Sequence, residues 1–215
     1  MLAKRFFDFS LSLIALLIAL PFILVIAILI KLSSAGPVLY AGTRIGQFGR
    51  PFRFLKFRTM VVDADKIGGP STADDDPRII RAGKFLRKYK LDELPQLLNV
   101  LKGDMSLVGP RPEVAQYVDM FSEQERAILT VRPGITDWAT LWNTDEGAAL
   151  AGSPDPEKTY AQQIRPVKIR LQLEYIRKHS FWVDLKILFQ TLFSIVFRLN
   201  PAAIKVLERG SENVE

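Results

Sequence analysis

The chain has 215 residues, of which 48% are hydrophobic and 24% charged, so it can bury one hydrophobic core of ordinary size. A formal net charge of +6 indicates anionic partners such as phosphate lipids, nucleotides or nucleic acid. The lack of cysteine excludes disulfides and thiolate metal sites, and the single histidine, His179, excludes a metal site built from several histidines.

The first predicted element is a membrane segment. Residues 9–30 carry no charge, and such an apolar run is long enough for a helix to cross a bilayer. Cations flank both ends, at Lys4, Arg5 and Lys31, and Pro21 near the middle removes a hydrogen bond and bends a helix. The residues alone leave a straight span and a re-entrant hairpin equally open, whereas the run is too long for a cleaved signal peptide.

The elements that follow predict an α+β fold that is mostly helical. A β-hairpin is expected at 36–60, where hydrophobic residues partly alternate and glycines punctuate the turn. The other expected elements are a loop at 61–80, a basic helix at 81–91, a helix at 92–102 ended by Gly103, a Gly/Pro loop at 103–112, a helix at 113–130, an irregular segment at 131–158, and helices at 159–178 and 181–199.

The last predicted helix is almost entirely apolar apart from a narrow polar stripe. Asp184, Thr191 and Arg198 recur at heptad spacing along it. A helix of this kind is either packed deep in a core or lies in a membrane interface. Because a membrane segment is already predicted, we expect this helix to be partly buried in the membrane.

Two adjacent carboxylates, Asp92 and Glu93, form the first candidate site. Asp92 is a suitable N-cap, which would place both groups at the positive end of a helix, where each ionised group gains roughly 0.3–1 kcal/mol. Nearby cations at 87, 88 and 90 also favour ionisation. An ionised carboxylate can attack phosphorus while its neighbour holds a divalent cation. The same Asp-Glu pair is also a common helix-capping pattern.

Three cations suit phosphate binding. Two prolines stiffen the chain around Arg111, as a bidentate phosphate contact requires, although a Pro-rich turn with an exposed arginine is the alternative. Lys56 and Arg58 are two residues apart on a predicted strand and so share one side of it, where cations commonly face solvent.

A rival metal site is an Asp-x-Asp pair. Asp63 and Asp65 have the spacing that nucleotide-sugar glycosyltransferases use to hold a metal, and Asp74, Asp75 and Asp76 form a second acidic cluster. Both lie in a loop rich in Gly and Asp, where solvated turns are the usual structure.

Four motifs in order resemble those of the monotopic bacterial phosphoglycosyl transferases, in their small single-domain form. The resemblance runs from about Lys4 to Leu199, and the Asp-Glu-Leu-Pro-Gln and Gly-Pro-Arg-Pro blocks at this spacing are highly specific. The motifs are Lys56-Phe57-Arg58-Thr59-Met60, the block from Leu91-Asp92-Glu93-Leu94-Pro95-Gln96-Leu97 to Lys102-Gly103-Asp104-Met105-Ser106, Val108-Gly109-Pro110-Arg111-Pro112, and Arg132-Pro133-Gly134-Ile135-Thr136.

The resemblance implies a reaction and a set of partners. Asp92 would attack the β-phosphate of a UDP-sugar and release UMP, and polyprenyl (undecaprenyl) phosphate would then accept the sugar phosphate. Glu93 would bind Mg²⁺, which neutralises charge developing on the diphosphate. Substrate-binding roles fall to Arg87, Arg111, Lys56, Arg58 and Asp184. Nucleic acid is not an expected partner, and an oligomer is possible.

The resemblance also implies a membrane architecture. Residues 1–32 would form a re-entrant helix-break-helix, and residues 33–215 a catalytic domain with interfacial amphipathic helices at the membrane surface. The expected location is the cytoplasmic face of the bacterial inner membrane. Family members often carry Ser-Pro at the break, where this chain has Leu20 before Pro21.

A second departure concerns the segment from Asp137 to Glu146, which replaces a common family continuation. That change indicates a sugar different from the commonest ones. Two other functions remain open at this point. One is a metal-dependent glycosyltransferase that uses Asp63 and Asp65, and the other is a non-catalytic scaffold that binds anionic lipid.

Overall fold

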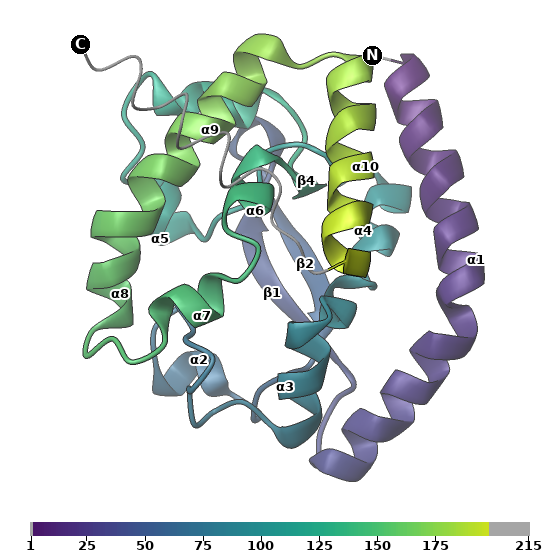
Figure 1. The fold of residues 1–215 in the computed structure, drawn as a ribbon, viewed down its shortest axis with the longest axis vertical. Coiled ribbons are helices and arrows are strands. Elements are labelled where there is room, and N and C mark those ends of the chain that lie inside the picture. The colour runs from purple at the N-terminus through teal and green to yellow at the C-terminus, as the bar shows by residue number, and fades with distance from the viewer. Residues whose placement is uncertain (1, 198–215) are drawn as a thin grey trace.

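The structure, a computed structural model, describes residues 2–197, and it is mostly helical with two small two-stranded sheets (Figure 1). This confirms the expected helical α+β architecture with a short hairpin. The elements are α1 (Leu2–Ser33), β1 (Leu39–Ile45), β2 (Pro51–Phe57), α2 (Ala64–Ile67), α3 (Arg81–Lys88), α4 (Gln96–Lys102), β3 (Ser106–Val108), α5 (Ala115–Val118), β4 (Gly134–Thr136), α6 (Trp138–Trp142), α7 (Glu146–Leu150), α8 (Pro156–Thr159), α9 (Arg165–Lys178) and α10 (Phe181–Phe197).

The hairpin β1-β2 is tied to α4 by a single amide side chain. Asn99 accepts a hydrogen bond from the Leu55 N–H at 3.0 Å and donates one to the Arg53 carbonyl at 2.8 Å. Because Asn99 pairs with backbone groups on the edge of β2, it fixes the distance between the hairpin and the helix that follows the candidate carboxylates.

The second sheet was not expected from the sequence. Strands β3 and β4 pair in parallel in the region where we predicted a Gly/Pro loop and an irregular segment. A Cβ atom on Gly134 would lie 2.1 Å from the backbone nitrogen of Gly109, so only glycine allows this approach. The pairing places the Gly-Pro-Arg-Pro and Arg-Pro-Gly-Ile-Thr motifs side by side.

Helix α1 is continuous through Pro21 and curves along one side of the molecule (Figure 1). Near its C-terminal end, Ile26 and Ile30 are buried against a cluster that includes Phe57 and Leu86. By length and composition α1 can cross a membrane. The helix-break-helix and the cytoplasmic orientation remain predictions.

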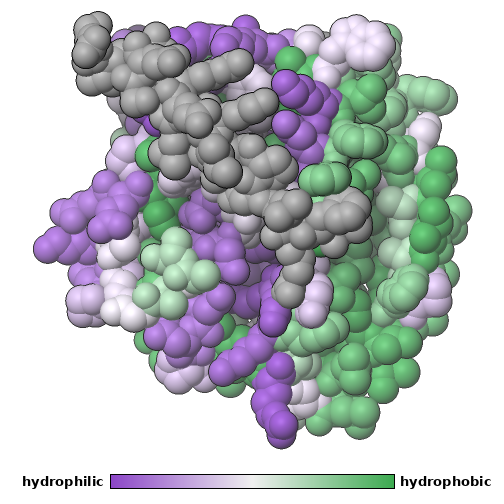
Figure 2. All heavy atoms as spheres, in the orientation of Figure 1, coloured by the Kyte–Doolittle hydropathy of each residue, from purple (hydrophilic) through white to green (hydrophobic). Residues whose placement is uncertain are grey.

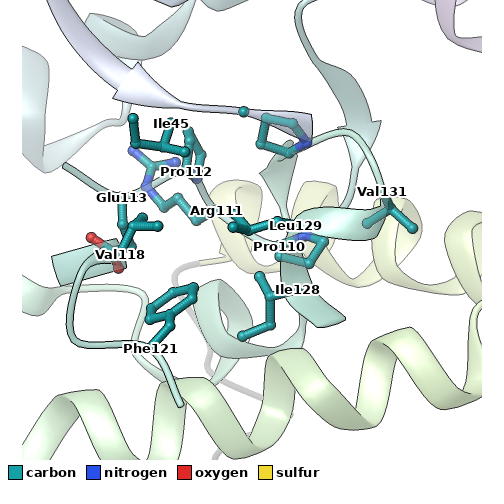
Figure 3. Close-up of a pocket in the computed structure, with 12 residues that line it drawn as sticks. Ile45, Pro110, Arg111, Pro112, Glu113, Val118, Phe121, Ile128, Leu129 and Val131 are labelled. Atoms are coloured by element: carbon teal, nitrogen blue, oxygen red, sulfur yellow. The ribbon is translucent and has the colours of Figure 1, made fainter. Parts of the chain in front are cut away.

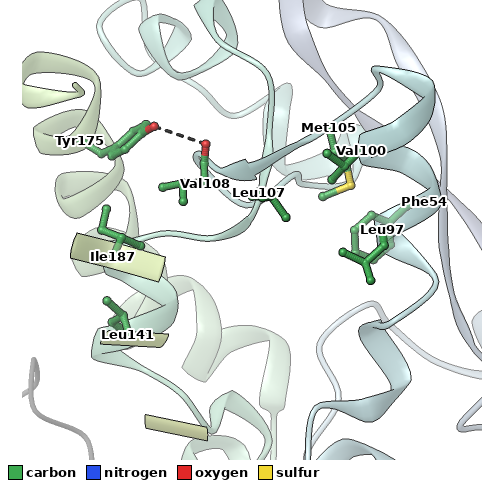
Figure 4. Packing of buried hydrophobic residues seen from close by; sticks show 9 residues of the cluster. All are labelled: Phe54, Leu97, Val100, Met105, Leu107, Val108, Leu141, Tyr175 and Ile187. Carbon is green, nitrogen blue, oxygen red and sulfur yellow. Dashed lines mark hydrogen bonds between the residues drawn. The ribbon is translucent and has the colours of Figure 1, made fainter. Parts of the chain in front are cut away.

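The largest hydrophobic cluster lies between α4, β3, α9 and α10 (Figure 4). Tyr175 of α9 is packed inside it, and its hydroxyl donates to Asp184 at 2.7 Å. The cluster anchors α4, whose preceding turn carries the candidate carboxylates. Its buried members are Phe54, Leu97, Val100, Met105, Leu107, Val108, Leu141, Tyr175 and Ile187.

A broad apolar surface follows α1, on the right-hand side of Figure 2. Helix α10 adds to the exposed apolar area, because Trp182 and Phe189 are about three-quarters exposed. The polar stripe of α10 faces the protein, since Asp184 is buried and Thr191 pairs with Thr136 at 2.8 Å. An apolar surface of this extent is typical of a membrane or partner contact. Residues 198 and 199, included in our prediction for this helix, lie outside the described part of the chain.

Candidate active site

The two candidate carboxylates lie in a single turn of 3-10 helix, Leu91–Glu93, just before α4. The prediction that Asp92 caps the helix is wrong: α4 begins at Gln96, and Asp92 makes no capping hydrogen bond. The sequence explains this, because the third position after Asp92 is Pro95, which has no N–H to donate. The N–H of Leu94 is used by the Leu91 carbonyl at 3.3 Å. The carboxylate of Asp92 is therefore free of the helix backbone.

Asp92 is buried with one oxygen unsatisfied. Asp92 is only 6% exposed, and its Oδ1 has no hydrogen-bond partner. Burial, followed by the charge of Glu93, raises the pKa of Asp92, although nearby cations such as Lys56 and Arg87 oppose the rise. Our expectation that the helix end favours ionisation is thus reversed, because the dipole argument holds for an exposed group. An unsatisfied buried acceptor costs about 1–3 kcal/mol, which favours a functional role for this oxygen.

Glu93 is held by Arg111 in a two-pronged ion pair. Arg111 Nη1 donates to Glu93 Oε2 at 2.9 Å, and Nη2 donates to Oε1. Burial would raise the pKa of Glu93, but the charge and hydrogen bonds of Arg111 outweigh burial and lower it. Glu93 is therefore the ionised member of the pair, and Asp92 is the member whose charge is less stable.

Arg111 is held in place through both its backbone and its side chain. Its N–H donates to Asp137 Oδ2 at 3.2 Å, and its Nη1 also donates to the Ile135 carbonyl at 3.1 Å. Gln172 of α9 donates to the same Asp137 oxygen at 3.2 Å. Asp137, the first residue of the divergent segment, therefore positions Arg111 and caps α6 through the N–H of Thr140.

The Gly-Pro-Arg-Pro loop is packed from below by apolar side chains, including Phe121 and Ile128 (Figure 3). The space between them is about 10 Å³, which is no larger than one water molecule needs. This space supports the loop and cannot admit a substrate. The side chain of Arg111 is only 25% exposed, so the alternative of a Pro-rich turn with an exposed arginine is wrong.

Lys56 and Arg87 lie close enough to Asp92 to act on its charge. Burial, then the charge of Arg87, lowers the pKa of Lys56 to about 8, while Asp92 pulls it upward. The Lys56 ammonium also lies 5.5 Å from the centre of the Tyr40 ring. Arg87 Nε donates to Thr59 Oγ1 at 3.2 Å, and its Nη2 donates weakly to Met60 Sδ at 4.0 Å.

Arg44 is a further site residue that the sequence analysis missed. The guanidinium carbon of Arg44 lies 5.7 Å from the centre of the Phe54 ring, and that of Arg111 lies 5.8 Å from it. Burial lowers the pKa of Arg44, and Glu113 opposes the change. Strand pairing could have revealed it: Arg44 lies opposite Phe52 and so shares a face with Phe54 and Lys56.

Around Asp92 itself cations outnumber carboxylates, because Lys56, Arg87 and Lys90 act on it against Glu93 alone. Arg87 and Lys90 act on Asp92 electrostatically, and Lys56 also experiences Arg44 and Glu93. The surplus of positive charge suits a ligand with several negative charges, such as a diphosphate. The full cluster comprises Arg44, Lys56, Arg87, Lys90, Asp92, Glu93 and Arg111.

Arg58 is not part of this cluster. Its guanidinium donates to the Ala35 carbonyl at 2.6 Å and to the Ser34 carbonyl at 2.7 Å, so it satisfies carbonyls at the end of α1. The prediction that Arg58 shares a side with Lys56 fails because β2 ends at Phe57 and the alternation stops there.

Asp184 lies toward the other end of α4. It is buried, accepts from Tyr175 and forms an ion pair with Lys4. Arg5, the residue after Lys4 in α1, donates to the Val100 carbonyl at 2.6 Å, near the C-terminus of α4. These contacts give Asp184 a structural role in joining α1, α9 and α10.

The rival Asp-x-Asp pair is at the surface. Asp63 forms an ion pair with Lys66 at 3.2 Å, and both side chains are more than half exposed. Asp65 is also exposed. Neither residue has the burial or the surrounding cations that distinguish Asp92.

The residues near Asp92 can provide ligands for Mg²⁺. This ion uses one or two carboxylates and completes its shell with water and substrate phosphates. Asp92 Oδ1 is unshared, whereas both oxygens of Glu93 are bound by Arg111. Within residues 2–197, no cluster of three or more His, Cys, Asp or Glu residues could hold a metal without substrate. Glu93 would need Arg111 to release one of its oxygens before it could bind an ion.

Comparisons with known proteins identify the family of the chain. A family model described as bacterial sugar transferase matches residues 1–198. The chain is 39% identical over 196 residues, 90% of its length and 43% of the relative, to a UDP-N-acetylgalactosamine-undecaprenyl-phosphate N-acetylgalactosaminephosphotransferase from Aeromonas hydrophila. It is also 39% identical to a UDP-glucose:undecaprenyl-phosphate glucose-1-phosphate transferase from Escherichia coli (strain K12), over 89% of this chain and 40% of the relative.

A relative of similar length is also found. The chain is 36% identical to the uncharacterized sugar transferase EpsL of Bacillus subtilis (strain 168), over 91% of this chain and 88% of the relative. The chain spans less than half the length of the Aeromonas and Escherichia relatives. The match to the family model, residues 1–198, includes every candidate site residue discussed above.

Proposed function

The chain belongs to the bacterial sugar transferase family, and from this membership we propose that it transfers a sugar phosphate from a UDP-sugar to undecaprenyl phosphate and releases UMP. The observation that carries the proposal is the unpaired, buried oxygen of Asp92 within a cluster of surplus cations. This combination provides a nucleophile and a site for the diphosphate in one place.

In the first half-reaction, Asp92 is the nucleophile. A lone pair on Oδ1 forms a bond to the β-phosphorus, and the bond from that phosphorus to the bridging oxygen breaks, so UMP leaves with the electron pair. In the second half-reaction, a phosphate oxygen of undecaprenyl phosphate attacks the same phosphorus and the Asp92 carboxylate leaves. The kinetics are therefore ping-pong.

The cations prepare Asp92 for attack and hold the donor. Burial disfavours the ionised form of Asp92 and so makes the carboxylate a stronger nucleophile. Lys56, Arg87 and Lys90 oppose this effect and keep the ionised form populated. Arg111 and Arg44 flank Phe54 and suit the oxygens of the diphosphate.

We further propose that Arg111 exchanges partners during donor binding. In the structure it occupies both oxygens of Glu93. A diphosphate that takes one of these hydrogen bonds would free a Glu93 oxygen. Glu93 would hold Mg²⁺, which neutralises charge on the diphosphate when it is bound, and Asp92 Oδ1 would stay free for attack.

The membrane arrangement follows from the apolar surfaces. We propose that α1 enters the membrane from the cytoplasmic face and returns to it by bending at Pro21, and that the exposed face of α10 lies in the interface. Cations at both ends of the apolar run, Lys4 and Lys31, support this orientation. The acceptor lipid then meets the catalytic cluster at the membrane surface.

The test is nucleotide release by purified protein in nanodiscs with Mg²⁺, undecaprenyl phosphate and a panel of UDP-sugars. The relatives' names include N-acetylgalactosamine and glucose, so both belong in the panel. We expect UMP release that requires Mg²⁺ and is lost in Asp92→Asn but kept in Asp63→Asn. Release of UDP, or UMP release by Asp92→Asn at the wild-type rate, would contradict the proposal.

A further inference from the structure

An open apolar groove lies between the end of α1 and the start of α3. Its volume is about 410 Å³, within the range of ligand sites in proteins. Leu86 forms a buried floor, and Phe85 on its rim is 53% exposed. The full lining is Leu29, Leu32, Ser33, Arg81, Ala82, Phe85 and Leu86.

The groove adjoins the segment that we assign to the membrane. Leu29 and Leu32 belong to the last turn of α1, and both are exposed. The Ala82 N–H lies 3.4 Å from Ser33 Oγ, so the two helix ends are held together at this point. A membrane lipid can therefore enter the groove along α1 without crossing water.

Helix α3 connects the groove to the catalytic cluster. Arg81 and Ala82 line the groove from the first turn of α3, Phe85 and Leu86 line it from the second, and the next residue, Arg87, belongs to the catalytic cluster. The helix is 8 residues long, which corresponds to a length of about 12 Å. Lys88, next to Arg87 in the last turn, is an exposed cation. An apolar chain in the groove can thus extend to a phosphate group near Asp92.

We propose that this groove binds the proximal prenyl units of the polyprenyl phosphate acceptor. The inference rests on the proposed function for the identity of the lipid. Charge complementarity selects a lipid with a terminal phosphate: the groove lining is mostly apolar with the cation Arg81 in it, and Arg87 and Lys88 stand in the last turn of α3, before the turn that carries Asp92. The groove therefore aligns the phosphate of the acceptor with the phosphorylated Asp92.

The test compares two tryptophan substitutions on the same helix. Ala82→Trp fills the groove, whereas Lys84→Trp adds the same bulk outside the groove lining. Binding of undecaprenyl phosphate is measured directly in detergent micelles, and the acceptor KM is measured at saturating donor. We expect Ala82→Trp to weaken both by about tenfold, and Lys84→Trp, whose side chain neither lines the groove nor serves the proposed phosphate contact, to change neither by more than about twofold.

A second variant guards against misfolding. Arg81→Ser removes an exposed cation from the groove without touching the core, and we expect a severalfold increase in the acceptor KM. The UMP burst measured without acceptor should stay at the wild-type amplitude in all three variants, because donor chemistry does not use the groove.

The outcomes separate this inference from the proposed function. If wild type gives no UMP burst, the reaction is wrong, and the direct binding comparison still decides the groove. Equal binding of the acceptor by Ala82→Trp and Lys84→Trp would overturn the groove assignment. Competition by phosphatidylglycerol at the same concentration as undecaprenyl phosphate would identify a general lipid site and would also overturn it.

Discussion

Buried carboxylates occur at both ends of α4, and their surroundings differ. Toward the C-terminal end, Asp8 accepts from Ser106 Oγ at 2.7 Å, and Asp184 accepts from Tyr175 at 2.7 Å. Lys4 lies close to both carboxylates. Before the N-terminal end, Asp92 is equally buried but retains an oxygen without a partner.

The comparison shows that burial alone does not identify a catalytic carboxylate. Asp8 and Asp184 have hydrogen-bonded partners, so their charges stabilise the junction of α1 with the rest of the protein. Asp92 has nearby cations but no hydrogen-bond partner for Oδ1. Its ionised carboxylate is therefore less stable in the absence of substrate than a fully hydrogen-bonded one. The difference lies in how completely each side chain is satisfied.

The largest expected effect is that of Asp92→Asn. Loss of the nucleophile should lower kcat by about 10⁴-fold or more, as at other covalent sites. Asn has the same size as Asp and removes a charge that burial disfavours. We therefore expect the Tm to stay equal to that of wild type or to rise slightly. UMP release and a thermal melt measured on the same preparation test both statements. A clear drop in Tm would place Asp92 in the same structural class as Asp184.

Arg111→Lys should have the next largest effect. Lysine cannot form the two-pronged contact with Glu93 or with a diphosphate, so we expect kcat/KM for the donor to fall by about 10²–10³-fold. The partner exchange proposed above also predicts that Mn²⁺, used as a probe for Mg²⁺, binds Arg111→Lys without donor more tightly than it binds wild type. Equal Mn²⁺ affinity in the two proteins would contradict the exchange.

Asp184→Asn tests the other end of α4. The substitution removes the negative partner of Lys4 and weakens the acceptor for Tyr175, so the free energy of unfolding should fall by about 1–3 kcal/mol. In a chain of this size the Tm should fall by several degrees. Turnover per folded molecule should stay within about threefold of wild type. A large loss of turnover at unchanged Tm would restore the substrate-binding role that the family resemblance gave to Asp184.

The sequence predicted the hairpin, the positions of α3 and α10, and the residues Lys56, Arg87, Asp92, Glu93 and Arg111 as members of one site. These predictions rest on local patterns and motif spacing. The parallel pairing of β3 with β4 was missed because each strand is three residues long and depends on the close approach of two glycine-containing turns. Such a long-range pairing leaves no periodic signal in either segment.

The wrong predictions share a physical cause. Asp92 as a helix cap and Arg58 as a partner of Lys56 both depended on where an element starts or ends. Both boundaries depend on neighbouring groups: the carbonyls of Ser34 and Ala35, just after α1, accept from Arg58, and Pro95 offers no N–H for Asp92 to cap. Arg44 was missed because its role depends on strand register.

The smallest expected effect concerns the pH dependence of donor binding. The pKa of Lys56 is lowered to about 8, so its ammonium is charged below pH 8 and loses its charge above it. Because a diphosphate binds the charged form, the donor KM should rise between pH 7 and pH 9, by about three- to tenfold. The kcat at saturating donor should change less, since bound phosphate stabilises the ammonium.

Lys56→Arg gives the matched control for this pH dependence. Arginine keeps its charge throughout this pH range, so the donor KM of the variant should be flat between pH 7 and pH 9, whatever its absolute value. If the KM of Lys56→Arg rises with pH as steeply as that of wild type, another group controls donor binding. A flat KM in the variant would instead assign the alkaline limb to Lys56, and would show that the cations around Asp92 act on the donor as well as on the carboxylate.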